Sequence, residues 1–283
     1  MTQFQSTLRI FTVLAFVGLV FTGCTKDETD PANNEALNSE ELRMATEMDD
    51  IEMVLEDVVI ASYEVQESSE TANRAYRNPP AVFPPCVTVT AVIQLNHREI
   101  TIDFGTEGCL FRGRLFRGQV YITYDRDPEA HEILITYNLI DFYVGPRQVI
   151  GNRTILRELS NENGNPQFTH TLDLTVIWPN GMQASREGVK IREWVEGFGN
   201  DIFTDDVFEI TGHWNATFLS GNTHSYDVIT PLRREVTCIH FVSGSIDVVR
   251  TNFSGVLDFG DGTCDNQATF TLDNGEVVNI TLN

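Results

Sequence analysis

Residues 86–283 alternate apolar and polar side chains with a period of two, and this pattern restricts the fold more than any other feature. Stretches such as CVTVTAVIQL, REITIDF and HSYDVIT place β-branched or aromatic residues at alternate positions, as half-buried strands require. The connectors PNG (179–181), SGN (220–222) and DNG (273–275) supply the positive φ angles of tight hairpins. No helix-length stretch separates the strands, so parallel crossovers are excluded. The sequence therefore predicts a mainly β fold.

The expected arrangement is an antiparallel meander of roughly a dozen strands in one domain, residues 86–283. A sandwich, an open barrel and a long curled sheet are all compatible with this pattern.

The N-terminus has the parts of a lipoprotein signal peptide. Residues 1–23 contain one charged side chain, Arg9, then the apolar run IFTVLAFVGLVF, then small or polar residues. A transmembrane helix needs roughly 20 apolar residues, and this run ends too early. The FTG before Cys24 resembles a bacterial lipobox, although Phe21 stands where leucine is usual. We therefore expect cleavage before Cys24 and a membrane anchor of two or three acyl chains, as diacylglycerol and palmitate, on that residue.

Charge and cysteine content agree with export to an envelope compartment. The formal net charge of −22 repels phosphate backbones, so nucleic acid is excluded as a partner, and anionic lipid headgroups are repelled too. The acyl anchor is then the expected contact with the membrane. Cys24 is the odd cysteine of five, and the other four can pair in an oxidising compartment.

Three segments are expected between the anchor and the β domain. Residues 24–37 form a polar tether, residues 38–76 an acidic amphipathic helix, and residues 77–85 a proline-rich linker. The helix has one apolar seam at coiled-coil-like spacing. Its members are Met44, Met48, Ile51, Leu55, Val58 and Val65, with Ser62 as the polar member.

The same helix is strongly acidic. Residues 38–70 carry 11 acidic side chains and one basic side chain, Arg43. We expect the seam to pack on the chain's own β domain while the acidic side chains form a solvated face. The alternatives are a helix-in-groove or coiled-coil contact with a partner, and a partly disordered stalk.

The β domain contains an internal repeat. ITIDFGTEGC and GVLDFGDGTC both end in DFGxxxC, and another cysteine precedes each copy. The copies span 86–123 and 238–283. Because each unit has its own two cysteines, we expect Cys86 to pair with Cys109 and Cys238 with Cys264, although other connectivities are open.

The second copy also suggests a metal site. Asp258, Asp261 and Asp265 place carboxylates within a short loop, and calcium prefers such oxygen ligands. Their spacing is not that of an EF-hand. We favour a glycine-rich turn in which the aspartates accept hydrogen bonds from backbone amides, with calcium binding as the alternative.

No catalytic residue can be assigned from motifs. The six histidines are scattered singly, and zinc-binding, nucleophile-elbow and phosphate-loop motifs are missing from the sequence. Trp178, Trp194 and Trp214 lie in or beside strands and are candidates for stacking on sugars, although packing in the core or between strands is the interpretation we favour.

Four stretches carry a resemblance to known proteins: SNENGNPQFTHTLDLTVIWPNG, SREGVKIREWVEGFG, TPLRREVTC and LDFGDGTCDNQATFTLDNG. They resemble a group of uncharacterised lipoproteins of Flavobacteria and other Bacteroidota, over 86–283, and this resemblance implies no particular activity. In that phylum, a lysine followed by acidic residues after the lipidated cysteine resembles a signal for export to the outer face of the outer membrane. Lys26, Asp27 and Glu28 match it, with Thr25 intervening.

The resulting hypothesis is a non-enzymatic lipoprotein anchored in the outer membrane and facing the cell exterior, where it binds a protein or a glycan or has a structural role. One alternative is an exported polysaccharide-active enzyme or accessory glycan-binding protein. Another is an envelope-assembly protein that faces the periplasm.

Overall fold

The computed structural model describes residues 40–68, 83–111, 113–127, 129–200, 202–250 and 253–282. The predicted signal peptide, lipidated Cys24, the tether with Lys26, Asp27 and Glu28, and most of the linker lie outside these residues. Those assignments therefore stay predictions.

The described chain contains one long helix, one short 3₁₀ helix and 15 strands. The helices are α2 (Glu40–Ser68) and η1 (Phe203–Asp205). The strands are β1 (Thr88–Ile93), β2 (His97–Asp103), β3 (Cys109–Phe111), β4 (Arg114–Asp125), β5 (Glu132–Val144), β6 (Arg147–Ile150), β7 (Asn152–Glu158), β8 (Gln167–Ile177), β9 (Gln183–Glu196), β10 (Val207–Phe218), β11 (Thr223–Glu235), β12 (Ser243–Val249), β13 (Ser254–Asp261), β14 (Gln267–Leu272) and β15 (Val277–Thr281). Neither helix in these ranges is long and apolar enough to span a membrane.

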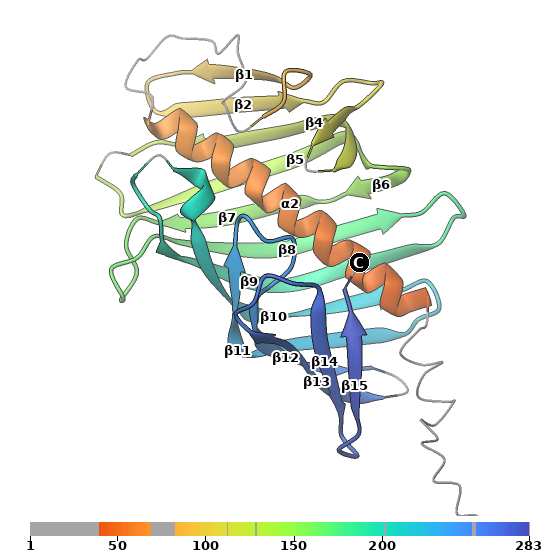
Figure 1. The fold of residues 1–283 in the computed structure, drawn as a ribbon. Helices are drawn as coiled ribbons and strands as arrows, with labels where there is room; N and C mark the ends of the chain where they lie inside the picture. The colour runs from red at the N-terminus through yellow and green to blue at the C-terminus, as the bar shows by residue number, and fades with distance from the viewer. Residues whose placement is uncertain are drawn as a thin grey trace, which may run out of the picture.

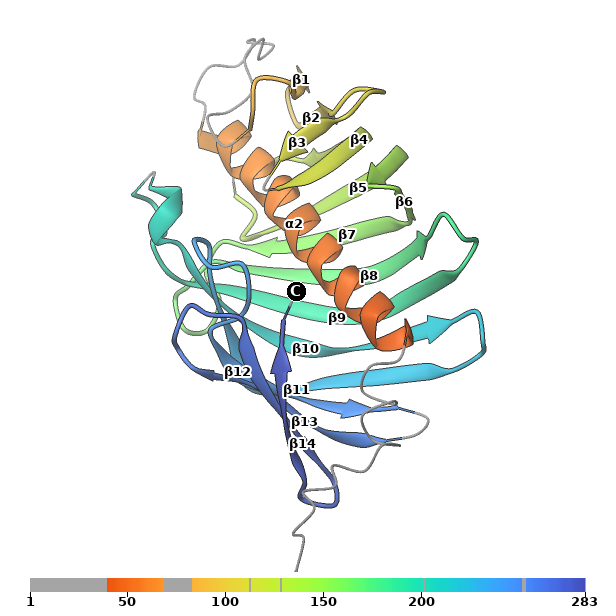
Figure 2. The same cartoon turned by 45° about the vertical axis from the view of Figure 1, so that its right-hand side comes forward.

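All strands belong to one antiparallel sheet, which confirms the predicted mainly β meander. The strand order follows the sequence from β1 to β15, with β3 paired to β4 at one side and β7 placed between β5 and β8. The sheet is curled, and α2 crosses its concave face diagonally, as Figure 1 and Figure 2 show. Of the three architectures compatible with the sequence, the protein adopts the long curled sheet.

The three hairpin turns form as their sequences predict. In each, the glycine has a positive φ: +81° at Gly181, +88° at Gly221 and +87° at Gly275. Each glycine amide donates to the carbonyl three residues earlier, as in the bond from Gly181 N to Trp178 O of 2.9 Å. These turns join β8 to β9, β10 to β11 and β14 to β15, and they fix the register of the neighbouring strands.

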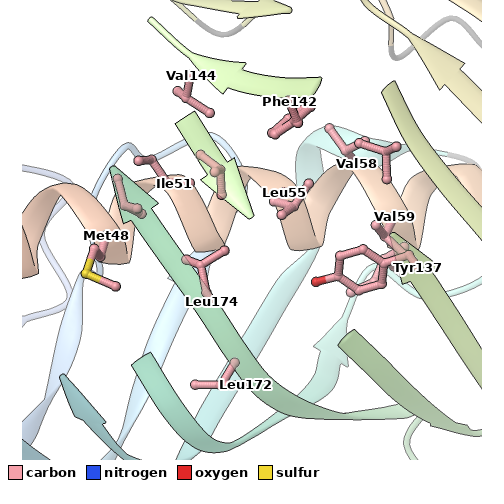
Figure 3. Packing of buried hydrophobic residues seen from close by; sticks show 14 of the residues in the cluster. Met48, Ile51, Leu55, Val58, Val59, Tyr137, Phe142, Val144, Leu172 and Leu174 are labelled. Carbon is pink, nitrogen blue, oxygen red and sulfur yellow. The ribbon is translucent and has the colours of Figure 1, made fainter. Parts of the chain in front are cut away.

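The apolar seam of α2 packs against the concave face, as predicted. Met48 and Leu55 are fully buried, and Figure 3 shows the seam facing side chains of β5 and β8, among them Phe142 and Leu174. Burial of each large apolar side chain contributes about 1.5–3 kcal/mol. The helix is therefore part of the core rather than an appendage.

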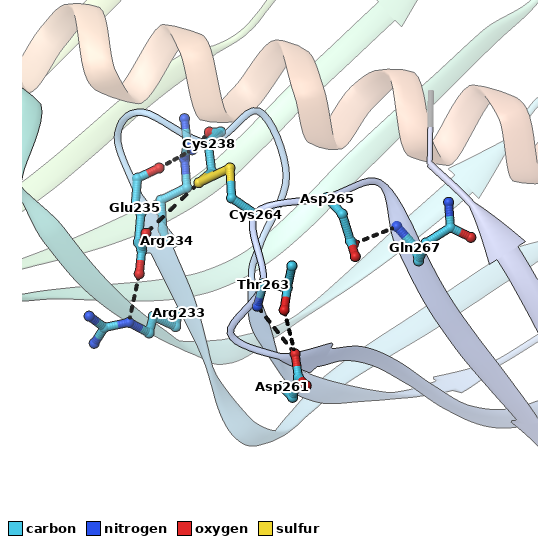
Figure 4. The surroundings of a disulfide bond; sticks show 9 residues. All are labelled: Arg233, Arg234, Glu235, Cys238, Asp261, Thr263, Cys264, Asp265 and Gln267. Carbon is cyan, nitrogen blue, oxygen red and sulfur yellow. Dashed lines mark hydrogen bonds and ion pairs between the residues drawn. A yellow bond between two sulfur atoms is a disulfide. The ribbon is translucent and has the colours of Figure 1, made fainter.

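Two disulfides link the cysteines as the repeat predicts. Cys86 is bonded to Cys109 with a Cα–Cα distance of 5.6 Å, and Cys238 to Cys264 with 5.7 Å. The second bond, drawn in Figure 4, joins the loop after β11 to the loop after β13. Each disulfide closes one copy of the repeat.

Candidate functional site: the ion-pair network between helix and sheet

The acidic side chains of α2 do not form a solvated face, and that prediction is wrong. Glu40 pairs with Arg43 on the exposed side of the helix. Every other acidic residue of α2 contacts the sheet or its loops; these are Glu41, Glu47, Asp49, Asp50, Glu52, Glu56, Asp57, Glu64 and Glu67. The sheet supplies the opposite charges, so the helix is held by ion pairs as well as by its apolar seam.

Glu52 is the centre of this network. Its side chain is fully buried. Oε1 accepts a hydrogen bond from Arg153 at 3.0 Å, and Oε2 accepts from Arg186 at 2.9 Å and from Lys190 at 3.2 Å. Burial alone would raise the pKa of Glu52, but these three cations hold the pKa well below its ordinary value. Glu52 is therefore a carboxylate at any physiological pH.

The next turn of α2 continues the network. Glu56 lies 3.9 Å from Lys190 Nζ and 3.8 Å from the ring of His170, while Asp57 forms an ion pair with Arg192 at 2.7 Å. Burial, with nearby cations, lowers the pKa of His170 to about 4, in spite of the Glu56 carboxylate. His170 is therefore neutral at pH 7.

Both ends of α2 are fixed in the same way. Near its N-terminus, Glu41 accepts hydrogen bonds from Ser220 at 2.7 Å and Asn222 at 3.0 Å, in the turn between β10 and β11. Near its C-terminus, Glu67 accepts from the hydroxyl of Tyr124 at 2.8 Å and from Arg126 at 2.9 Å. Hydrogen bonds to charged side chains therefore hold both ends of α2, one at the turn between β10 and β11 and the other at β4.

Strand alternation explains how the sheet presents its cations to the helix. On β9, Arg186, Lys190 and Arg192 occupy alternate positions and are all buried on the concave side, while Glu187 points outward and is exposed. Most basic residues of the sheet are buried in this way: Arg98, Arg153, Arg157, Arg186, Lys190, Arg192, Arg234 and Arg250. The outer face carries polar and acidic side chains together with exposed apolar ones such as Leu134 and Val249.

The candidate tryptophans have packing roles. Trp178 and Trp214 are buried, and the indole nitrogen of Trp178 donates to Glu47 at 2.6 Å. Trp214 stacks on Tyr226 with an interplanar angle of 16°. Trp194 is half-buried against Phe208. Two of the three rings are therefore covered, so neither forms an exposed platform for a sugar.

The candidate calcium ligands accept the backbone and hydroxyl hydrogen bonds of the favoured interpretation, but Asp258 and Asp261 lie in β13 and not in a turn. Asp258 accepts from the amide of Gly260 at 2.8 Å, and Asp265 accepts from the amide of Gln267 at 2.9 Å. Asp261 accepts from the hydroxyl of Thr263 at 2.8 Å, as Figure 4 shows. Within the described ranges, no group of three or more histidine, cysteine or acidic side chains is arranged to hold a metal ion. Calcium binding stays a hypothesis without support from this geometry.

Comparison with known proteins adds no assignment: no protein-family model, curated protein or solved structure is significantly similar to this chain. The network itself is the feature that sequence motifs did not reveal. Basic residues at even spacing in β7 and β9, which places them on one face of each strand, and acidic residues flanking the helical seam, are the signals that would have indicated it.

Proposed function

We propose that the protein is a lipid-anchored, non-catalytic lipoprotein on the outer face of the outer membrane, which binds a polar partner through the convex face of its sheet. The observation that carries this proposal is the occupation of the concave face by α2 (Figure 2). The convex face is then the face of the sheet left for a partner.

The convex face has a row of threonines across four neighbouring strands. Thr123 of β4 is paired with Thr136 of β5, Thr136 with Thr154 of β7, and Thr154 with Thr171 of β8. Hydroxyl groups repeated at the strand spacing of about 4.8 Å offer both donors and acceptors for hydrogen bonds. Such a surface suits the polar groups of a protein or a glycan.

The buried titratable groups support a structural rather than a catalytic use. Glu52 and His170 have strongly shifted pKa values, which elsewhere can mark catalytic residues. Here Glu52 of α2 and His170 of β8 are both buried between the helix and the sheet, where ion pairing and burial explain the shifts. The shifted pKa values of these two groups therefore reflect attachment of the helix.

Localisation is tested in intact cells. Replacement of Cys24 by serine should release the protein from the membrane fraction. Replacement of Lys26, Asp27 and Glu28 by alanine should keep the lipoprotein inside the envelope, so that protease added to intact cells no longer cleaves it. Cleavage of the unchanged protein only after rupture of the outer membrane would instead support the periplasm-facing alternative.

Binding is tested with a glycan array and the full chain. Thr154→Arg changes the convex face, and Asn274→Arg changes the turn between β14 and β15. Loss of glycan binding in the first variant but not in the second would support the proposed surface. If no glycan on the array is bound and no polysaccharide is hydrolysed, a protein partner is favoured. Hydrolysis of any polysaccharide by the purified protein would contradict the non-catalytic role and favour the enzyme alternative.

A further inference from the structure

The two edge strands of the sheet lack the usual protection against pairing with another chain. β1 and β15 end the strand order, and the part of the chain that the structure describes places no further strand beside either one. Edge strands commonly carry charged residues, proline or a bulge that prevent such pairing. The strands TVTAVI and VVNIT contain neither charge nor proline, and each pairs with its neighbour without a register shift.

The two edges differ in how well they cover the core. At β1, the inward side chains Val89 and Ala91 are 5% and 8% exposed. At β15, the inward side chains Val278 and Ile280 pack on the core but are only partly buried. The core is therefore less completely covered at the β15 edge.

Charge restricts which surface can meet a second copy of this chain. In a symmetric dimer the same patch contacts itself, so acidic groups in the patch face their own copies. The chain has a net charge of −22, and most of its surface would be repelled in such a contact. β15 and its neighbour β14, with the sequence QATFTL, are both free of charged residues. This edge can approach a second copy without like charges facing each other.

We propose that two copies of the protein pair through antiparallel β15 strands, with the two-fold axis at Asn279. This register gives full overlap of the five residues of β15. Val277 of one protomer then lies opposite Thr281 of its partner, and Val278 lies opposite Ile280. The apolar pairs join the two cores on the concave side, while Asn279 meets its copy on the convex side. The two sheets become continuous.

Cysteine cross-linking tests the register. In the unstrained antiparallel pair, the two Asn279 Cα atoms are about 5 Å apart, within the range of a disulfide. Asn279→Cys should therefore give a covalent dimer on a non-reducing gel of the full chain in detergent. Thr281→Cys is the matched control, because its two copies lie about 14 Å apart along the strands and should not cross-link.

Sedimentation of the full chain gives an independent measurement. Asn279→Lys places two ammonium groups opposite each other and should lower the measured mass from a dimer to a monomer. Thr171→Lys, in the middle of the convex face, should leave the dimer intact. Circular dichroism checks that both variants are folded.

Three outcomes would overturn the proposal. The first is that the unchanged protein is monomeric at all concentrations. The second is equal cross-linking of the cysteine variants at positions 279 and 281. The third is that Thr90→Cys on β1 cross-links and Asn279→Cys does not. Because none of these measurements uses a ligand or a location in the cell, the dimer and the proposed binding function can fail independently.

Discussion

Replacement of Glu52 by glutamine would measure what the ion-pair network contributes to stability. The change keeps the shape of the side chain but removes the charge that Arg153, Arg186 and Lys190 share. Breaking a buried ion pair by removal of one partner costs about 3–5 kcal/mol, because the remaining charges stay buried without compensation. Glu40→Gln is the control on the same helix, since its pair with Arg43 is half-exposed. Such a surface pair contributes about 1 kcal/mol or less.

Urea unfolding at pH 7 distinguishes the two variants. With an m-value of about 3 kcal/mol/M, the midpoint should fall by about 1–1.7 M for Glu52→Gln and by far less for Glu40→Gln. A second change, Lys190→Met, should cost less in the Glu52→Gln background than alone, because it then removes a buried cation that has lost its nearer carboxylate and keeps only Glu56. Equal midpoints for the two glutamine variants would refute the argument that the network stabilises the attachment of α2.

The pH dependence of this effect follows from the depressed pKa of Glu52. A carboxylate with a lowered pKa stabilises the folded state above its unfolded value of about 4.3, and this contribution is lost as the pH falls through the folded pKa. The difference in free energy of unfolding between the unchanged protein and Glu52→Gln should therefore be constant from pH 5 to 8 and shrink only in stronger acid.

Three further changes test other parts of the structure. Burial and a neighbouring carboxylate raise the pKa of Asp206 to about 7. The folded state therefore binds more protons than the unfolded state from about pH 4 to 7, so stability falls as the pH rises through this window. Asp206→Asn should remove this fall in the free energy of unfolding, measured by urea unfolding at pH 5 and pH 8. An unchanged fall would contradict the assignment to Asp206. Gly188→Ala should cost about 2–3 kcal/mol in thermal unfolding, because a methyl group would collide with the backbone of β10. Gly181→Ala, in an open turn, should cost about 1 kcal/mol, and equal losses would show that no collision occurs. Removal of both Cys86 and Cys109 should lower stability by about 3 kcal/mol, and mass spectrometry of the non-reduced protein should show these two residues in one linked peptide.

The strand pattern and the turns were determined locally and could be predicted. A period of two in stretches such as HSYDVIT indicates a half-buried strand whatever lies on either side. Glycines such as Gly221 indicate tight turns because their positive φ angles are sterically allowed for few other residues. The repeat predicted the disulfides, because each copy contains its own two cysteines.

β7 and β13 were missed for different reasons, and for β7 the reason is that burial of a charge depends on a distant partner. β7 has the sequence NRTILRE. Its inward positions include Arg153 and Arg157, although arginine normally faces solvent. β13 contains the DFG motif and was interpreted as a turn. In β7 the alternation was present, but charged residues at inward positions made it unrecognisable without the structure. In β13 the inward residues Leu257 and Phe259 are apolar, and the glycine and aspartate of the motif concealed the strand.

The sequence by itself determined a meander of antiparallel strands preceded by an acidic helix with one apolar seam. Only the tertiary structure decided where the acidic charge of that helix lies. A carboxylate such as Glu52 is stable in the core only when several cations converge on it, and those cations come from β7 and β9, far away in the chain. A local pattern can show that charged residues occupy inward positions, but not which of them meet, because the electrostatic interaction depends on distance in space and not on separation in sequence.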